Sequence, residues 1–142
     1  MQGEIKAARA AGIVVIATLQ YYEQPLGDYN IETAKVQVND FALLAEAGAN
    51  IVSGSQGHAI QGFGITGNTF IHYGVGNLFF DQMQALILRQ NFIDRYVIYN
   101  NQVVSVELLT TIRDESALPR PMTTAERRSL LTDLFAVSNW GK

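Results

Sequence analysis

The stretch Ile13-Val14-Val15-Ile16-Ala17-Thr18-Leu19 decides the fold class of this chain. It is a continuous apolar run rich in β-branched residues, which is typical of a parallel strand covered on both faces. A helical pattern follows over residues 31–47 and stops at Gly48, and a short second strand is expected at residues 50–53. Strand, helix and strand with short links predict a βαβ unit whose strands run parallel.

The segments around this unit predict a helix and two antiparallel hairpins. A helix is expected over residues 2–11, with Gly12 as its stop. Gly67-Asn68 and Asn100-Asn101 are turn sequences between alternating segments, so each predicts a hairpin. Thr123 begins a capping box ahead of a C-terminal helix. The fold class is therefore α/β, with a parallel unit, antiparallel hairpins and a C-terminal helix.

Length and composition favour a single well-buried unit over residues 1–142. The chain is 48% hydrophobic and only 16% charged, and its net charge is −3. These values argue against disorder and against nucleic acid as a partner. No apolar run reaches the length of a membrane span. Because the chain has no cysteine, disulfides, thiolate metal sites and a cysteine nucleophile are excluded.

Ligands of open α/β sheets bind beyond the carboxyl ends of the parallel strands. This rule selects the loop Gln20-Tyr21-Tyr22-Glu23 after the first strand and Gly54-Ser55-Gln56-Gly57-His58 after the second. Both loops should open onto the same edge. A third segment, residues 74–82, places Asn77 and Asp81 after a glycine-rich turn. Together these segments supply the candidate site residues.

Each candidate side chain has a structural alternative. His58 is either a ligand or a structural loop histidine, and Asp81 either orients a metal-bound water or caps a helix beginning at Gln82. Glu23 is either a general base or an exposed loop carboxylate. For His72, in the middle of a strand, a structural hydrogen-bonded role is expected.

The aromatic residues of the same region are expected to form core. Their positions are 63, 70, 73, 79 and 80. A carbohydrate-binding platform built from some of them is the alternative.

Two strings carry a family resemblance. They are Ile51-Val52-Ser53-Gly54-Ser55-Gln56-Gly57-His58 and Phe70-Ile71-His72-Tyr73-Gly74-Val75-Gly76-Asn77-Leu78-Phe79-Phe80-Asp81-Gln82. They resemble the capsule synthesis protein CapA family, which is linked to bacterial capsule and poly-γ-glutamate production. The resemblance covers about residues 4–112. It implies a calcineurin-like metallophosphoesterase fold, in which two sheets are sandwiched between helices.

The family pattern places a metal-binding histidine after the first strand and a His-Pro-His after the second. In this chain Gln20 stands at the first position, and Gln56 and Gly57 replace the first two residues of the triplet. Only His58 is kept. A carboxamide oxygen is a much weaker ligand than imidazole for zinc, manganese or iron. The resemblance therefore implies a degenerate metal site.

The remaining family ligands lie in an N-terminal half that precedes the segment this chain resembles. The chain thus resembles the C-terminal half of a CapA-like domain. For this chain alone we expect no cofactor, whereas a divalent metal is possible in an intact parent. The expected partners are the missing N-terminal half or a self-association partner, together with envelope polymer. The family resemblance indicates an extracytoplasmic, cell-envelope location.

Three functional hypotheses follow. The leading one is a non-catalytic module in biosynthesis of an envelope polymer, with Gln20, Tyr21, Glu23, Ser55, Gln56, His58 and Asn77 contacting the ligand. The second is a metal-dependent hydrolase with His58 and Asp81 as catalytic residues and His58 as a metal ligand. The third is a stand-alone structural or interaction domain.

Overall fold

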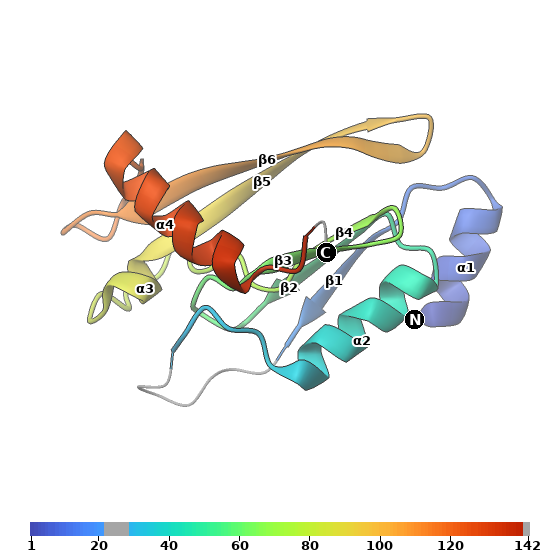
Figure 1. Cartoon of the computed structure of the whole chain (residues 1–142), viewed down its shortest axis with the longest axis horizontal. Helices are drawn as coiled ribbons and strands as arrows, with labels where there is room; N and C mark the ends of the chain where they lie inside the picture. Colours follow the sequence, from blue (N-terminus) through green and yellow to red (C-terminus); the bar gives the residue numbers. More distant parts are fainter. Residues whose placement is uncertain (22–28, 141–142) are drawn as a thin grey trace.

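Two β-sheets lie face to face, with helices packed around them, in the computed structural model (Figure 1), which describes residues 1–21 and 29–140. The helices are α1 (Gln2–Ala10), α2 (Lys35–Glu46), α3 (Leu86–Arg89) and α4 (Thr124–Val137). The strands are β1 (Ile16–Gln20), β2 (Ile51–Ser55), β3 (Phe63–Thr66), β4 (Thr69–His72), β5 (Gln90–Tyr99), β6 (Gln102–Arg113) and β7 (Pro119–Pro121). None of these helices has both the length and the apolar character needed to cross a bilayer.

The first sheet has the strand order β1-β2-β4-β3. β2 pairs in parallel with both β1 and β4, and β3 is antiparallel to β4. The expected βαβ unit is confirmed as β1-α2-β2, and the expected turn at Gly67-Asn68 joins β3 to β4. The carboxyl ends of three parallel strands, at Gln20, Ser55 and His72, therefore reach the same edge of this sheet.

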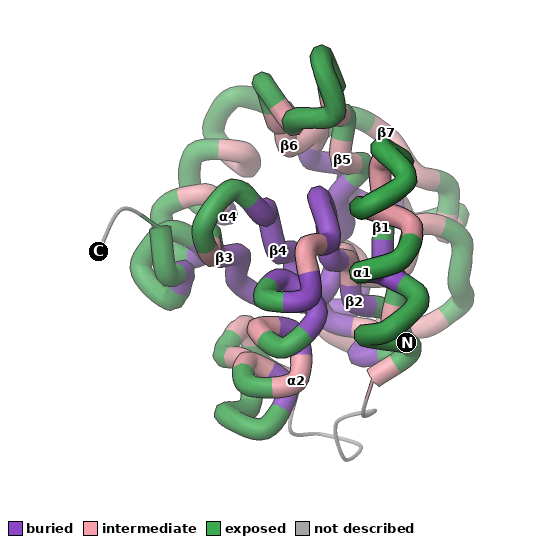
Figure 2. Tube along the Cα trace, turned by 90° about the vertical axis from the view of Figure 1, so that its right-hand side faces the viewer, coloured by how far each residue is buried: buried purple, intermediate pink, exposed green. Residues whose placement is uncertain are grey.

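α1 and α2 pack on one face of the first sheet. Their core contains Ile5, Phe41, Val52 and Ile71, all buried. Figure 2 shows the buried part of the chain concentrated around β2 and β4, with exposed chain at the periphery. This core fixes the strands whose ends carry the candidate site.

α2 begins later than the periodicity predicted. It starts at Lys35, whereas residues 31–34 are not helical. The Ile31 carbonyl accepts a hydrogen bond from the Gly62 N–H, and the Ile31 side chain packs against the core between the sheets. These tertiary contacts take the residue out of the helix. Gly48 follows the helix with φ +103°, as expected for a helix stop.

The second sheet has the order β5-β6-β7 and shares a core with the first sheet and α4. Phe63, Phe70, Phe92 and Leu134 are buried in this core. The predicted turn at Asn100-Asn101 joins β5 to β6, and both residues have positive φ (48° and 60°).

The predicted capping box is present at the start of α4. The Thr123 hydroxyl accepts from the Glu126 N–H, and the Glu126 carboxylate accepts from the Thr123 N–H. The hydrogen bond from Arg120 and those from Thr123 lower the pKa of Glu126 to about 2. The C-terminal helix thus begins where its local sequence predicts.

The prediction that residues 13–19 are covered on both faces is wrong. Ile13 and Ile16 are 54% and 53% exposed, and Ala17 alone is buried in β1. Val15 and Leu19 pack on the core beneath. The reason is that Ile16 faces away from this core, and the core between the two sheets contains no residue of β1 among those that the structure describes.

A buried polar pair joins the two sheets. His72 Nδ1 on β4 lies 2.7 Å from Asp94 Oδ2 on β5, and the two side chains are 0% and 6% exposed. The Tyr96 hydroxyl donates to the same carboxylate oxygen (2.9 Å), and burial together with Asp94 raises the pKa of Tyr96. The structural role expected for His72 is confirmed.

Replacing Asp94 by Ala should lower the free energy of unfolding by about 3–5 kcal/mol, because His72 and the Tyr96 hydroxyl lose their buried acceptor. Denaturant unfolding measures this value. Arg95→Ala is the matched control, since the neighbouring Arg95–Glu107 pair is exposed and should contribute at most about 1 kcal/mol. Equal losses in the two variants would contradict the structural role of the pair.

Candidate functional site

The three loops selected from the sequence meet at the carboxyl edge of the first sheet. Gln20 Nε2 donates to Gln56 Oε1 (2.6 Å), which joins the loop after β1 to the loop after β2. His58 Nδ1 lies 2.9 Å from Asn77 Oδ1, which joins the loop after β2 to the segment after β4. The prediction that these loops share one edge is confirmed. We call the set Gln20, Ser55, Gln56, His58 and Asn77 the rim.

The loop at the centre of the rim has an unusual backbone. Gln56 and His58, on either side of Gly57, both have positive φ (79° and 55°). This conformation costs a non-glycine residue roughly 1–2 kcal/mol, and surrounding contacts must hold it. The two rim hydrogen bonds provide such contacts. The strain is therefore located at the residues that face the neighbouring loops.

Two glycines allow the close approaches that build the rim. A Cβ on Gly54 would lie 1.9 Å from the Tyr73 carbonyl oxygen, and one on Gly76 would lie 2.5 Å from that of Gln90. Gly76 also has φ +76°. Side chains at these positions would separate β2 from the end of β4, or the segment after β4 from β5. Gly54 and Gly76 of the two motif strings are thus required by backbone packing.

The buried carboxamide of Gln37 forms hydrogen bonds close to the end of β4. Gln37 Nε2 on α2 donates to the Tyr73 carbonyl (2.8 Å) and to Gln61 Oε1 (3.2 Å). Gln37 is only 3% exposed, although glutamine side chains usually lie on the exposed face of a helix. Its spacing of four residues from the buried Phe41 is the signal that could have found it.

Phe79 and Phe80 are exposed, although core positions were expected. Their exposed fractions are 72% and 45%, and the Phe80 ring lies 5.1 Å from the His58 ring. Phe63, Phe70 and Tyr73 are buried as expected. The two adjacent phenylalanines follow β4 in an irregular segment, so no strand turns them inward.

Gln82 belongs to this arrangement and was missed as a site residue. Asn77 Nδ2 donates to Gln82 Oε1 (3.3 Å). Because the Asn77 nitrogen is directed to Gln82, its oxygen faces His58 and accepts from the Nδ1–H of the imidazole. No spacing rule connects a turn asparagine with a glutamine five residues later.

Two further candidate side chains, Tyr21 and Ser55, form hydrogen bonds with neighbouring groups. The Tyr21 hydroxyl donates to Asp40 Oδ2 (2.8 Å), and burial and this carboxylate raise the pKa of Tyr21. The Ser55 hydroxyl donates to the Leu19 carbonyl (3.3 Å). Glu23 lies outside the described residues.

Asp81 is exposed, and its charge acts on Arg113. No helix begins at Gln82; α3 starts at Leu86, so the helix-capping alternative for Asp81 is wrong. Its proposed catalytic role remains a prediction.

The donor set at the rim does not fit a transition metal. His58 is the one imidazole there, and Gln20 and Gln56 offer carboxamide oxygens, which bind such ions weakly. In residues 1–21 and 29–140, no group of three or more histidine, aspartate and glutamate side chains is placed to hold an ion. The rim can instead donate and accept hydrogen bonds through uncharged groups.

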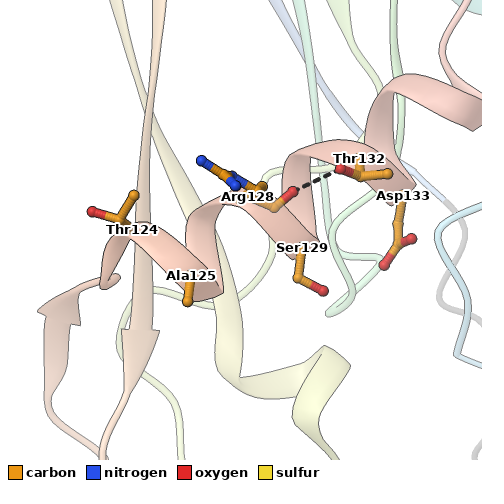
Figure 3. Close-up of a pocket in the computed structure, with 6 residues that line it drawn as sticks. All are labelled: Thr124, Ala125, Arg128, Ser129, Thr132 and Asp133. Atoms are coloured by element: carbon orange, nitrogen blue, oxygen red, sulfur yellow. Dashed lines mark hydrogen bonds between the residues drawn. The ribbon is translucent and has the colours of Figure 1, made fainter.

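A hollow of about 580 Å³ lies elsewhere, over α4 (Figure 3). It is lined by Thr124, Ala125, Arg128, Ser129, Thr132 and Asp133. All of these residues come from one helix, and the Thr132 hydroxyl donates to the Arg128 carbonyl of the preceding turn (2.9 Å). Since no second element contributes a side chain, this hollow is a weaker candidate for a ligand site than the rim.

The family model of the bacterial capsule synthesis protein PGA_cap matches residues 1–82. The chain belongs to this family. The match ends earlier than the resemblance over residues 4–112, but it includes β1, β2, β4 and every rim residue. The second sheet and α4 of this PGA_cap protein lie outside it. No curated protein matches the chain.

Gln56→Gly should raise the free energy of unfolding by about 1 kcal/mol, because glycine adopts the positive φ without strain. The exposed hydrogen bond to Gln20 that it removes contributes less than this gain. Ser55→Gly, one residue earlier in β2, is the control and should lower stability, since the backbone there is extended. Denaturant titration of both variants tests this, and a loss at Gln56 would show that the loop is not strained.

Proposed function

We propose that this PGA_cap protein is a non-catalytic module in biosynthesis of a capsule or poly-γ-glutamate-type envelope polymer, and that its rim holds the polymer. The observation that carries the proposal is the Gln20–Gln56 hydrogen bond. Two residues at positions where the family resemblance implies imidazoles bind each other at 2.6 Å through carboxamides. This pair offers little to a cation and much to a polar, uncharged group.

The surroundings of the rim support binding of an extended ligand. Phe79 and Phe80 add exposed apolar surface beside His58, and the strained loop 56–58 holds that imidazole in a fixed place. Ligand sites typically combine such apolar surface with a few fixed polar groups. In this proposal the residues that contact the polymer are Gln20, Tyr21, Glu23, Ser55, Gln56, His58 and Asn77.

A metal-dependent hydrolase of the metallophosphoesterase type is the second candidate. It is favoured by the convergence of His58 and Asn77 at the carboxyl edge of the parallel strands. It requires ligands beyond those that the described residues supply. His58 and Asp81 would then be its catalytic residues in a longer protein with a complete site.

The double variant Gln20→His, Gln56→His should bind one Zn²⁺ or Mn²⁺ ion per chain, because two imidazoles would join His58 at the rim. The protein without these substitutions should bind neither Zn²⁺ nor Mn²⁺ tightly. Elemental analysis of the protein at its natural length, after dialysis against each metal, measures this. Adding His58→Ala to the double variant is the control and should abolish binding.

Two results would contradict this interpretation. A tightly held, stoichiometric metal in the unmodified protein would overturn the non-catalytic function. Absence of metal from the double variant would overturn the residue positions carried over from the family.

We also propose that β1 is covered by a further strand, contributed by an N-terminal half of the domain or by a second copy. The fold would then be the complete sandwich of two sheets between helices that the family resemblance implies. The support is the unpaired edge of β1 among the described strands, together with the exposure of Ile16 and of Ile13 just before the strand. Open edges of this kind pair readily with other strands.

Ile16→Lys should lower the free energy of unfolding of the natural-length protein by at least about 1.5 kcal/mol if β1 is covered. Ile65→Lys is the matched control, since Ile65 is also 53% exposed and lies on β3, at the opposite edge. It should change stability by no more than about 0.5 kcal/mol. Equal effects would indicate an open β1, and a melting temperature that rises with protein concentration would identify a second copy as the cover.

A further inference from the structure

Arg113 is a fully buried arginine at the end of β6, outside the residues that match the family. Its Nη2 donates to the Gln82 carbonyl (2.8 Å) and to the Leu88 carbonyl. Its own carbonyl accepts from Arg89 Nε (3.0 Å) and Nη2 (2.8 Å). One guanidinium therefore ties both ends of the segment 82–88 to the second sheet.

This segment leads directly into the rim. Gln82, whose carbonyl accepts from Arg113, also accepts from Asn77 Nδ2 through its side chain (3.3 Å). Asn77 Oδ1 in turn faces His58 Nδ1 at 2.9 Å. The contacts form an unbroken series from Arg113 through Gln82 and Asn77 to His58.

The guanidinium is a costly group at this position. Arg113 Nε and Nη1 are buried and have no hydrogen-bond partner among the described residues. Burial and the nearby Arg89 lower the pKa of Arg113, while the Asp81 carboxylate opposes them. An apolar side chain of similar volume would fill the space without burying a charge. What the arginine adds is a pair of hydrogen bonds to the carbonyls of Gln82 and Leu88. The negative charge of Asp81 partly compensates its positive charge.

We propose that Arg113 is a positioning residue of the rim: it fixes Gln82, which orients the Asn77 amide, which keeps the proton of neutral His58 on Nδ1. The second sheet would thus contribute to a site whose visible groups all lie in the first 82 residues. The proposal concerns the same rim as the proposed function, but it requires no ligand, so either can fail without the other.

Nitrogen NMR of the imidazoles tests this in the protein at its natural length. His58 and His72 are the two histidines of this sequence, and His72 is bonded to Asp94 between the sheets. The His72 signal therefore reports whether the packing of the sheets is intact. Spectra at a pH of about 8.5, above the ordinary imidazole pKa of about 6.5, distinguish the two neutral tautomers.

In Arg113→Met, the ratio of the Nδ1–H to the Nε2–H form of His58 should fall roughly two- to tenfold, the range that one hydrogen bond supplies, with His72 unchanged. Arg113→Lys should restore part of this ratio, because an ammonium can still donate to the Gln82 carbonyl. Arg127→Gln is the matched control: the Arg127 guanidinium also donates to a backbone carbonyl, that of Leu108 on β6 (2.6 Å), but has no contact with the segment 82–88 among its hydrogen bonds. It should leave His58 unchanged.

An unchanged His58 ratio in Arg113→Met would overturn the proposal. If that variant also alters His72, Gln82→Leu decides, because it breaks the series of contacts and leaves Arg113 in place. A fall in the His58 ratio with His72 intact then supports the positioning role, and an unaltered ratio overturns it.

Discussion

The parallel pairing of β2 with both of its neighbours is the constraint on which the rest of this structure depends. It brings the ends of β1, β2 and β4 to one edge, with Gln20 opposite Ser55 in the register. The pairing is possible at this closeness because Gly54 has no side chain to meet the Tyr73 carbonyl. The Gln20–Gln56 and His58–Asn77 contacts follow from that geometry, since each joins segments that leave adjacent strands. A strand order with β3 beside β2 would have placed Asn77 away from His58.

Local sequence signals predicted the elements of the fold well, and non-local contacts explain the errors. The turns at residues 67–68 and 100–101 and the capping box at Thr123 depend on a few adjacent residues, so they were predicted correctly. The exposure of Ile16 depends on what packs over its face of the sheet, and no pattern within β1 carries that information. The parallel pairing of β4 with β2, across a hairpin, is non-local in the same way.

The same division applies to the candidate site. Gln20, Gln56, His58 and Asn77 could be selected from the sequence because they follow parallel strands or stand in a recognisable motif. Gln82 and Arg113 could not, because no spacing rule links Gln82 to Asn77, and Arg113 donates to backbone carbonyls brought near by tertiary folding. Every residue has a backbone carbonyl, so the sequence does not indicate which carbonyl a side chain will bind. Residues that hold a site in place are therefore harder to predict than those that form its surface.

The chemistry of the rim follows from how much of its hydrogen-bonding capacity is already used. A glutamine side chain offers two donors and two lone pairs, and the Gln20–Gln56 bond occupies one group on each residue. The remaining donors and lone pairs of the two glutamines can bind a ligand while the Gln20–Gln56 hydrogen bond stays in place. An imidazole pair at the same separation would instead share a cation. Carboxamides at these two positions therefore bind transition-metal ions weakly and present polar groups that can form hydrogen bonds.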